Sequence, residues 1–386
     1  MNRGSQGNLR NQSIGSPESF RAFVPVPLPP NPAIDWSGNL IHSLSRADML
    51  LGRLDGIGRV LPDTGLLIYF YSRKEAVLSS QIEGTQSTLS ELLLFEADKL
   101  FPEKAEDLLE VSNYLAAMSH GLDRLRHGFP LSLRLIREMH EVLLRRGRGG
   151  NQTPGEFRRT QNWIGGSRPG NAAYIPPPVP EMIECLGHLE KFIHDGGAAF
   201  PPLVEAALVH VQFESIHPFL DGNGRIGRLL IPLLLMERGV LSEPLLYPSL
   251  YLKQHKAEYY DLLQRVRFGG EWEEWIQFFV EAIAAAAEQG VDLSKRIHQL
   301  FAEDEKRIVG AGTRAQLGPV YRFLQKHPVS LMSGVVRETG LSLPTVSRVL
   351  EKLREMGIVD EVSGRERNRV YRYTRYVDML NEGTEL

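Results

Sequence analysis

Residues 203–234 read LVEAALVHVQFESIHPFLDGNGRIGRLLIPLL, and this stretch decides the fold. Apolar side chains recur at helical spacing over residues 203–216, which predicts a buried helix. Pro218 disfavours helical geometry at the residue before it, so the helix should end there. Residues 221–224, Asp-Gly-Asn-Gly, are typical of a tight turn, and helical periodicity restarts directly after them. The stretch therefore predicts a glycine-rich loop held between two helices.

Side chains suited to phosphate chemistry occupy this loop. The second helix begins with unpaired backbone N–H groups, and glycines let a phosphate approach them closely. Arg225 and Arg228 lie three apart, so both guanidiniums can face one polyphosphate. Asp221 supplies a hard oxygen for Mg²⁺, and His217 can accept a proton near neutral pH. Each of these residues alone is more simply explained as part of a turn or of the core. Their occurrence together, at fixed spacings in one segment, predicts chemistry on a phosphate anhydride.

The segment from His217 to Arg228 resembles the signature of the Fic family, His-x-Phe-x-Asp/Glu-Gly-Asn-Gly-Arg-x-x-Arg, at every specified position. The resemblance implies a protein adenylyltransferase, which transfers AMP from ATP to a Tyr, Thr or Ser hydroxyl of a protein. It implies that His217 deprotonates this hydroxyl and that Asp221 holds Mg²⁺. The kinase-like branch of the family has lysine where this chain keeps Gly224, which favours AMP transfer. The residues implied to bind ATP are Gly222, Asn223, Gly224, Arg225, Ile226, Gly227 and Arg228.

Residues 79–84 read SSQIEG and end another helical pattern. Ser79 and Glu83 share a helix face because they lie four apart, and Gly84 is the usual residue after a helix end. Alone, this segment would be a surface glutamate beside an ordinary cap. Beside the Fic signature it resembles the inhibitory-helix motif of class II members, Ser/Thr-x-x-x-Glu-Gly/Asn. The resemblance implies that Glu83 pairs with Arg228 and leaves ATP misaligned for attack.

A loop rich in Gly, Pro and Asn separates two short extended stretches within residues 154–178. This composition predicts a small β-hairpin, and its plainer interpretation is an exposed loop. Its position resembles the Fic flap, which clamps a target segment by strand addition. The residues implied to border the nucleotide are Ile164, Gly165 and Gly166. Those implied to meet the target are Tyr174 and Ile175.

Two adjacent tyrosines, Tyr259 and Tyr260, resemble the pair that lines the adenine side of the site in related proteins. Adjacent tyrosines on a helix are otherwise simple core and surface neighbours. The related pattern often has Asn where this chain has Arg267, so the adenosine contact departs from the family at that position.

Length, charge and cysteine content limit the classes of protein that fit. The chain has 386 residues, a formal net charge of −3 and one cysteine, Cys185. A nucleic-acid polycation is therefore excluded, as are an internal disulfide and a Cys-based zinc site. Cys185 lies in an amphipathic pattern, and we expect a buried core thiol. No signal peptide or spanning apolar run is found, so we expect a cytoplasmic protein with no membrane partner.

The fold class that we expect is mainly α: a Fic-type helical core with a small β-hairpin flap, plus a C-terminal winged-helix module. Composition and periodicity divide the chain into five parts. They are a disordered tail (1–22), an N-terminal helical region with the inhibitory helix (23–110), the Fic catalytic core (111–295), a linker (296–312) and the winged helix-turn-helix module (313–386).

The last part has its own organisation. Pro319 suits the first position of a short helix, Leu331–Thr339 and Leu343–Met356 read as two more, and two alternating strands follow within residues 358–373. This order resembles a winged helix-turn-helix, whose third helix would enter the DNA major groove. Winged helices also serve as protein-interaction modules. Glutamates near the basic residues reduce the positive charge of the surface that would meet DNA. The residues that would contact DNA are Thr345, Ser347, Arg348, Arg365, Arg367 and Arg369.

The resemblances together predict an autoinhibited protein adenylyltransferase that depends on Mg²⁺ and ATP and modifies an unidentified target protein and itself. A homodimer and DNA binding through the C-terminal module are further expectations. One alternative is a DNA-binding regulator whose Fic domain senses nucleotide. Another is the reverse reaction, AMP removal, in which Glu83 positions a water molecule.

Overall fold

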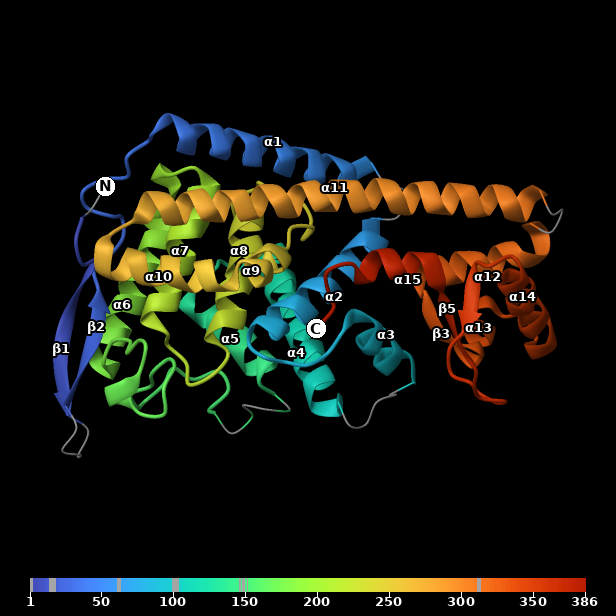
Figure 1. Ribbon diagram of the computed structural model, residues 1–386, viewed down its shortest axis with the longest axis horizontal. Coiled ribbons are helices and arrows are strands. Elements are labelled where there is room, and N and C mark those ends of the chain that lie inside the picture. Colours follow the sequence, from blue (N-terminus) through green and yellow to red (C-terminus); the bar gives the residue numbers. More distant parts are fainter. Residues whose placement is uncertain are drawn as a thin grey trace.

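The two helices expected around the glycine-rich loop are present. They are α7 (Pro202–Ile216) and α8 (Asn223–Glu237), which pack against each other inside the molecule (Figure 1). Leu203 to Ile216 are all buried, which explains why α7 has no polar face. The computed structural model describes residues 3–13, 19–60, 64–98, 104–145, 147, 150, 152–310 and 314–386.

Other helices enclose this central pair. The long helix α11 (Trp272–Gly310) lies alongside α1 (Gly38–Val60) along one side of the molecule, as Figure 1 shows. Trp275 of α11 is fully buried and stacks on His210 of α7, so α11 closes the core over the central helices. The remaining helices of this part are α4 (Ala105–Arg126), α5 (Leu133–Leu143), α6 (Val179–Lys191), α9 (Ser249–Gln254) and α10 (Lys256–Gly269), with short turns at η2 (Pro169–Asn171), η3 (Phe192–Gly196) and η4 (Gly197–Ala199).

The segment 79–84 lies at the end of a helix, as predicted. Helix α2 (Thr64–Ile82) packs against α4 and α9, and α3 (Leu89–Asp98) follows it. Gly84 has a φ of 99°, the left-handed conformation that ends a helix and that glycine adopts without strain. Helix α2, which carries this segment, contacts both α8 of the central pair and α15 near the end of the chain.

The beginning of the chain differs from the sequence-based prediction. Strands β1 (Gly7–Ser13) and β2 (Ser19–Pro25) pair antiparallel, so a disordered tail over residues 1–22 is wrong for the described residues. Composition alone missed long-range partners. One of these is the ion pair between Arg3 and Glu273, which fastens the start of the chain to α11.

The predicted linker is also wrong as far as residue 310, because α11 continues through it to Gly310. Leu300 and Ile308 are buried, so the second half of the helix is part of the hydrophobic core. Buried Asp304 accepts a hydrogen bond of 2.6 Å from the hydroxyl of Tyr373. One rigid helix therefore connects the two parts of the molecule, and their hydrophobic core is continuous.

The C-terminal part combines helices with a small sheet of strand order β3-β5-β4, antiparallel throughout. Pro319 lies inside the first helix rather than at its first position, because this helix begins a turn earlier than expected. The three-residue strand β3 was not predicted, since it is too short for alternation to be seen. The elements are α12 (Arg314–Lys326), β3 (Val329–Leu331), α13 (Met332–Thr339), α14 (Leu343–Glu355), β4 (Val359–Glu361), β5 (Val370–Tyr373) and α15 (Thr374–Asn381).

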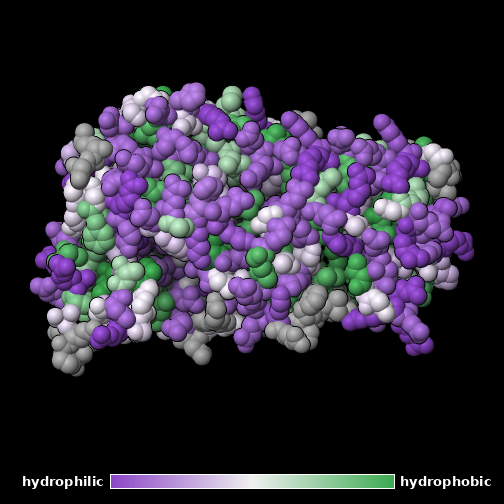
Figure 2. All heavy atoms as spheres, viewed as in Figure 1, coloured by the Kyte–Doolittle hydropathy of each residue, from purple (hydrophilic) through white to green (hydrophobic). Residues whose placement is uncertain are grey.

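The surface and the core fit the ordinary composition of the chain. The face drawn in Figure 2 is mostly hydrophilic, with hydrophobic side chains in small scattered patches. Cys185 is buried, as predicted, and burial raises the pKa of its thiol to about 12. Within the described part of the chain, no helix is both long and apolar enough to cross a membrane.

Candidate active site

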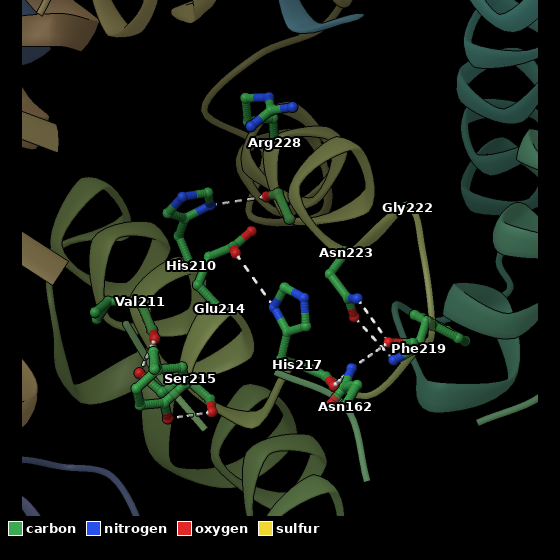
Figure 3. Close-up of polar contacts among 12 residues, drawn as sticks. Asn162, His210, Val211, Glu214, Ser215, His217, Phe219, Gly222, Asn223 and Arg228 are labelled. Atoms are coloured by element: carbon green, nitrogen blue, oxygen red, sulfur yellow. Dashed lines mark hydrogen bonds and ion pairs between the residues drawn. The ribbon is translucent and has the colours of Figure 1, made fainter. Parts of the chain in front are cut away.

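His217 follows the last residue of α7 in a left-handed conformation, with a φ of 48°. Its backbone N–H donates to the carbonyl of Phe213, and Pro218 then prevents the helix from continuing. The imidazole is held inside the molecule with its Nδ1 3.9 Å from the carboxylate of Glu214, one turn earlier on α7 (Figure 3). The sharp backbone turn thus directs this ring toward the start of α8.

The electrostatic surroundings keep His217 neutral. Burial, together with the positive charges of Arg267 and Arg158, lowers its pKa to about 3. Burial raises the pKa of the neighbouring Glu214 to about 7. A neutral imidazole has one nitrogen lone pair free, which can accept a proton from a hydroxyl that turns acidic as it reacts, although the low pKa makes His217 a weak base in this conformation.

The loop between the helices is braced by amide side chains. The N–H of Phe219 donates to Oδ1 of Asn223 (2.9 Å), and Nδ2 of Asn223 donates back to the Phe219 carbonyl (2.8 Å). Asn162 donates to the same carbonyl (2.8 Å), and these contacts are visible in Figure 3. Asn223 was expected to bind phosphate, but its side chain is committed to the loop. The second N–H of its Nδ2 is not used by these bonds, so a phosphate contact of Asn223 stays a prediction.

Asp221 is the acidic residue of the loop. Its Oδ1 accepts the N–H of Gly222 (2.6 Å) and lies 3.2 Å from Nη2 of Arg225, while the side chain is partly exposed. His140 supports this turn from below, because its ring donates to the Asp221 carbonyl and stacks on Phe219. Among the described residues, no cluster of three or more His, Cys, Asp or Glu could hold a metal ion. A single carboxylate fits Mg²⁺ only if phosphate and water supply the other ligands, which is how Mg²⁺ is usually held with nucleotides.

The two signature arginines point to different partners. Arg225 is buried near Glu110 (3.6 Å) and Asp221, and neither its Nε nor its Nη1 has a hydrogen-bond partner among the described residues. Arg228 instead donates to Oγ of Ser79 (2.8 Å) and to Oε1 of Glu83 (2.6 Å). The two guanidiniums were expected to face one polyphosphate together. They do not converge in this conformation, because Arg228 is bonded to Ser79 of α2 and to Glu83 just after it.

Glu83 reaches across the start of α8. Burial opposes its ionisation, but the charge and hydrogen bond of Arg228 outweigh this effect and lower its pKa below the usual range. A Cβ added at Gly224 would lie 2.2 Å from Oε1 of Glu83, so only glycine at this position admits the carboxylate. The sequence-based pairing of Glu83 with Arg228 is thus present in the structure.

A second polar network lies behind the loop and was not predicted. His210 contacts the Gly227 carbonyl through Nδ1 (2.9 Å) and the hydroxyl of Tyr259 through Nε2 (2.8 Å). Burial lowers the pKa of His210 to about 4. In the sequence, only the position of His210 on the buried helix face drew attention to it. That position does not show whether a histidine is merely packed in the core or also hydrogen-bonded there. Tyr259 is thereby a buried support, whereas its neighbour Tyr260 is 40% exposed.

The predicted flap is reduced to one antiparallel bridge, between Ile164 and Tyr174. Gly165 and Gly166 form its exposed tip, both with positive φ. The Tyr174 ring is buried, because its hydroxyl donates to the Ser215 carbonyl (2.6 Å).

The two residues expected to meet the target, Tyr174 and Ile175, also make contacts within the chain. The guanidinium of Arg267 lies over the Tyr174 ring, 3.9 Å from its centroid. The carbonyl of Ile175 already accepts the N–H of Phe23 from β2. The Tyr174 side chain and the Ile175 carbonyl are therefore bonded within the chain, and contact of these residues with a target stays a prediction. Arg267, noted only as a departure from the family pattern, also connects the flap to α7, because it donates to Ser215 and Glu214.

The predicted DNA contacts lie on α14 and on the loop between β4 and β5. Ser342 caps α14, and Thr345 and Ser347 of its first turns are half-buried. Arg348 is exposed on the same helix. The loop arginines Arg365 and Arg367 are exposed, while Arg369 is half-buried and donates to the Arg365 carbonyl (3.2 Å).

Comparison with known proteins agrees with this geometry. Residues 41–123 match the family described as Fic/DOC family N-terminal, and residues 130–235 match the Fic/DOC family itself. These two regions of the chain are thus similar to the Fic/DOC family. The chain is homologous to proteins named protein adenylyltransferase Fic, with 36% identity to one from Aedes aegypti over 168 residues and 28% to one from Drosophila melanogaster over 271.

These alignments cover only part of each relative. The first spans 42% of this chain and 29% of the Aedes protein, and the second spans 67% of this chain and 50% of the Drosophila protein. A solved structure of a Fic family protein from Desulfovibrio desulfuricans matches 88% of this chain and 97% of its own length. Its TM-score is 0.56 at 19% identity, which supports the mainly helical fold, including the small hairpin and the C-terminal sheet with helices.

Proposed function

We propose that this chain transfers AMP from ATP to a hydroxyl side chain of a protein. The observation that carries the proposal is the neutral His217 held at the start of α8, beside a glycine-rich loop and the unfilled donors of Arg225. Its homologues named protein adenylyltransferase Fic add support. A helix start with free N–H groups suits phosphate, and a neutral imidazole suits proton abstraction.

The reaction follows from these positions. The hydroxyl oxygen of the target attacks the α-phosphorus of ATP while a nitrogen of His217 takes the hydroxyl proton. The bond between the α-phosphorus and the bridging oxygen to the β-phosphate breaks, and pyrophosphate leaves. The loop backbone and Arg225 stabilise the charge that develops on the phosphate oxygens. Asp221 would hold Mg²⁺, which neutralises phosphate charge when bound.

We further propose that Glu83 restrains this activity. In the described conformation its carboxylate occupies Arg228, which is the expected ligand of the outer phosphates. A carboxylate at that place repels a phosphate and removes its cationic partner. ATP bound against it would present its α-phosphate poorly for in-line attack, which alone costs much of the rate.

AMP removal is the second candidate reaction, and one observation favours it. The lowered pKa keeps Glu83 ionised, and its side chain is 32% exposed although Oε1 is bonded to Arg228. An ionised and accessible carboxylate can orient a water molecule toward a phosphoester. Glu83 would then be required for removal and inhibitory for transfer.

We also propose that the C-terminal part of the chain is a winged helix-turn-helix. Three helices precede the β4–β5 hairpin, and α14 begins with exposed positions beside a loop that carries exposed Arg365 and Arg367. DNA binding would use these arginines on phosphates. A nucleotide-sensing DNA regulator remains the alternative to catalysis for the whole chain.

The deciding experiment incubates the Glu83→Gly protein with ATP labelled on either the α- or the γ-phosphate. We expect stable label on protein from the α-phosphate alone, with His217→Ala in the same background as the control. Label from the γ-phosphate would indicate phosphoryl transfer instead. Nucleotide binding with no label from either phosphate would favour the sensor.

A further inference from the structure

We propose that residues Glu382–Glu385, which follow α15, hold the inhibitory helix α2 in the position that places Glu83 on Arg228. This inference rests on the proposed function. These residues are called the 382–385 segment. They lie against the C-terminal half of α2, far from the sheet of their own module, and Figure 1 shows α15 directed toward α2. The C-terminal module thereby has a physical connection to the inhibitory contact.

The strongest contact is at the end of α2. The amide of Gln81 donates to the carbonyls of Thr384 (2.8 Å) and Ser87 (2.7 Å). Lys253 of α9 donates to Oε1 of Gln81 (2.7 Å) and to the carbonyl of Glu385. Thr384 is 1% exposed, so this is a buried joint rather than a surface contact.

A second contact lies two helical turns earlier on the same face of α2. Lys74 donates to the carbonyl of Glu382, whose carboxylate also pairs with Arg296 of α11 (2.7 Å). Gly383 has a φ of 82°, and a Cβ there would lie 2.8 Å from Leu250 of α9. The segment is therefore fastened to α2, α9 and α11 at once.

Gln81 is part of the turn that aims Glu83. Its carbonyl accepts the N–H of Gly84 (3.0 Å), while the Ser80 carbonyl accepts the N–H of Glu83 (3.0 Å). If the segment moved away, one N–H of the buried Gln81 amide would lose its hydrogen-bond acceptor. An unsatisfied buried donor raises the free energy of the folded state, so the turn is expected to rearrange. Because Glu83 lies two residues further on, such a rearrangement moves its carboxylate away from Arg228.

The joint is polar and incompletely packed, which suits a contact that opens. A cavity of about 310 Å³ lies beside it, lined by residues of α2, α9 and α11 and by the segment itself, among them Lys74, Leu78, Leu250, Arg296 and Gly383. Opening the joint therefore gives up few apolar contacts. A displacement of α15 within the C-terminal module would reach Glu83 through this joint.

The test is Gly383→Val, which places a branched side chain on Leu250 in a backbone conformation that favours glycine. We expect AMP transfer to rise about 5-fold or more, the lower end of ordinary coupling between sites. Amide hydrogen exchange at residues 83–85 should rise with it. Leu386→Ala is the matched control, because its side chain is 65% exposed and lies just beyond the segment, and it should change neither readout.

Lys253→Met removes both ammonium contacts by a different route, and it should change both readouts in the same direction. Adding Gly383→Val to Glu83→Gly should give no further gain, because both act through one contact. Unchanged exchange at residues 83–85, or faster exchange without faster transfer, would overturn the proposal. If Glu83→Gly itself shows no AMP transfer, the proposed function fails, while the exchange comparison still decides whether the segment holds α2.

Discussion

Oε1 of Glu83 lies 2.6 Å from Nη2 of Arg228, although the two residues are 145 positions apart in the chain. Arg228 is fully buried and donates to Ser79 as well, so the end of α2 occupies its guanidinium. Gly224 leaves the space that the carboxylate needs. The resting conformation thus uses the expected phosphate ligand as an internal ion pair.

His217→Ala should reduce AMP transfer by ~10²–10⁴-fold, the usual contribution of a positioned base. ATP binding should be largely kept, because the ring contacts Glu214 rather than the glycine-rich backbone. Labelling rates and ATP affinity are measured on the same protein preparation. A variant that labels at the wild-type rate would exclude His217 as the base.

Asp221→Ala should weaken the response of transfer to Mg²⁺. Asp221 is the acidic side chain of the loop, and its remaining oxygen is not used by the contact with Gly222. The rate is measured over a range of Mg²⁺ concentrations and with excess EDTA. Equal wild-type rates with Mg²⁺ and with EDTA would remove the metal from the mechanism.

His210 should make stability fall in acid. Burial lowers its pKa to about 4 in the folded protein, below the usual 6.5. The contribution of neutral His210 to the free energy of unfolding is therefore complete above pH 6.5. It is lost as the pH falls toward 4, which lowers the free energy of unfolding by about 3 kcal/mol. His210→Gln should be less stable at pH 7 but should lose less on acidification, measured as the free energy of unfolding at pH 7 and pH 4.5. An equal loss in both proteins would contradict this assignment.

Arg365→Ala combined with Arg367→Ala should leave self-labelling unchanged, because both side chains are exposed on the loop between β4 and β5. If the module binds DNA, the same pair of changes should lower the salt dependence of binding by about one to two units of slope. Binding is measured on duplex DNA at several salt concentrations. No binding at any salt would leave protein interaction as the role of the module.

Local signals predicted the central helices and the end of the helix before Gly84 well. Pro218 and the glycines after it act on the backbone within a few residues, so α7, the loop and α8 follow from the sequence. The pairing of Glu83 with Arg228 came from a family resemblance, since nothing local joins residues so far apart.

The misses all involve partners distant in the chain. The contacts of Tyr174 with Ser215 and Arg267 were not predicted, because those two residues lie on helices far along the chain. The strand β1 and the continuation of α11 through residue 310 depend likewise on tertiary contacts that composition does not reveal.

The rate of AMP transfer by Glu83→Gly, compared with wild type, tests the central claim most directly. Removing the carboxylate frees Arg228 for the outer phosphates, and recovery of about 3 kcal/mol of barrier would raise the rate ~10²-fold. Arg228→Ala should not reproduce the gain, because it removes the phosphate ligand along with the ion pair. Glu83→Gly combined with His217→Ala is the control and should be silent.

The measurement is label transferred from the α-phosphate of ATP per unit time, at equal protein and Mg²⁺ concentrations. The predicted result is faster labelling by Glu83→Gly that disappears in the double variant. An unchanged or lower rate for Glu83→Gly would contradict inhibition by the pair of Glu83 and Arg228.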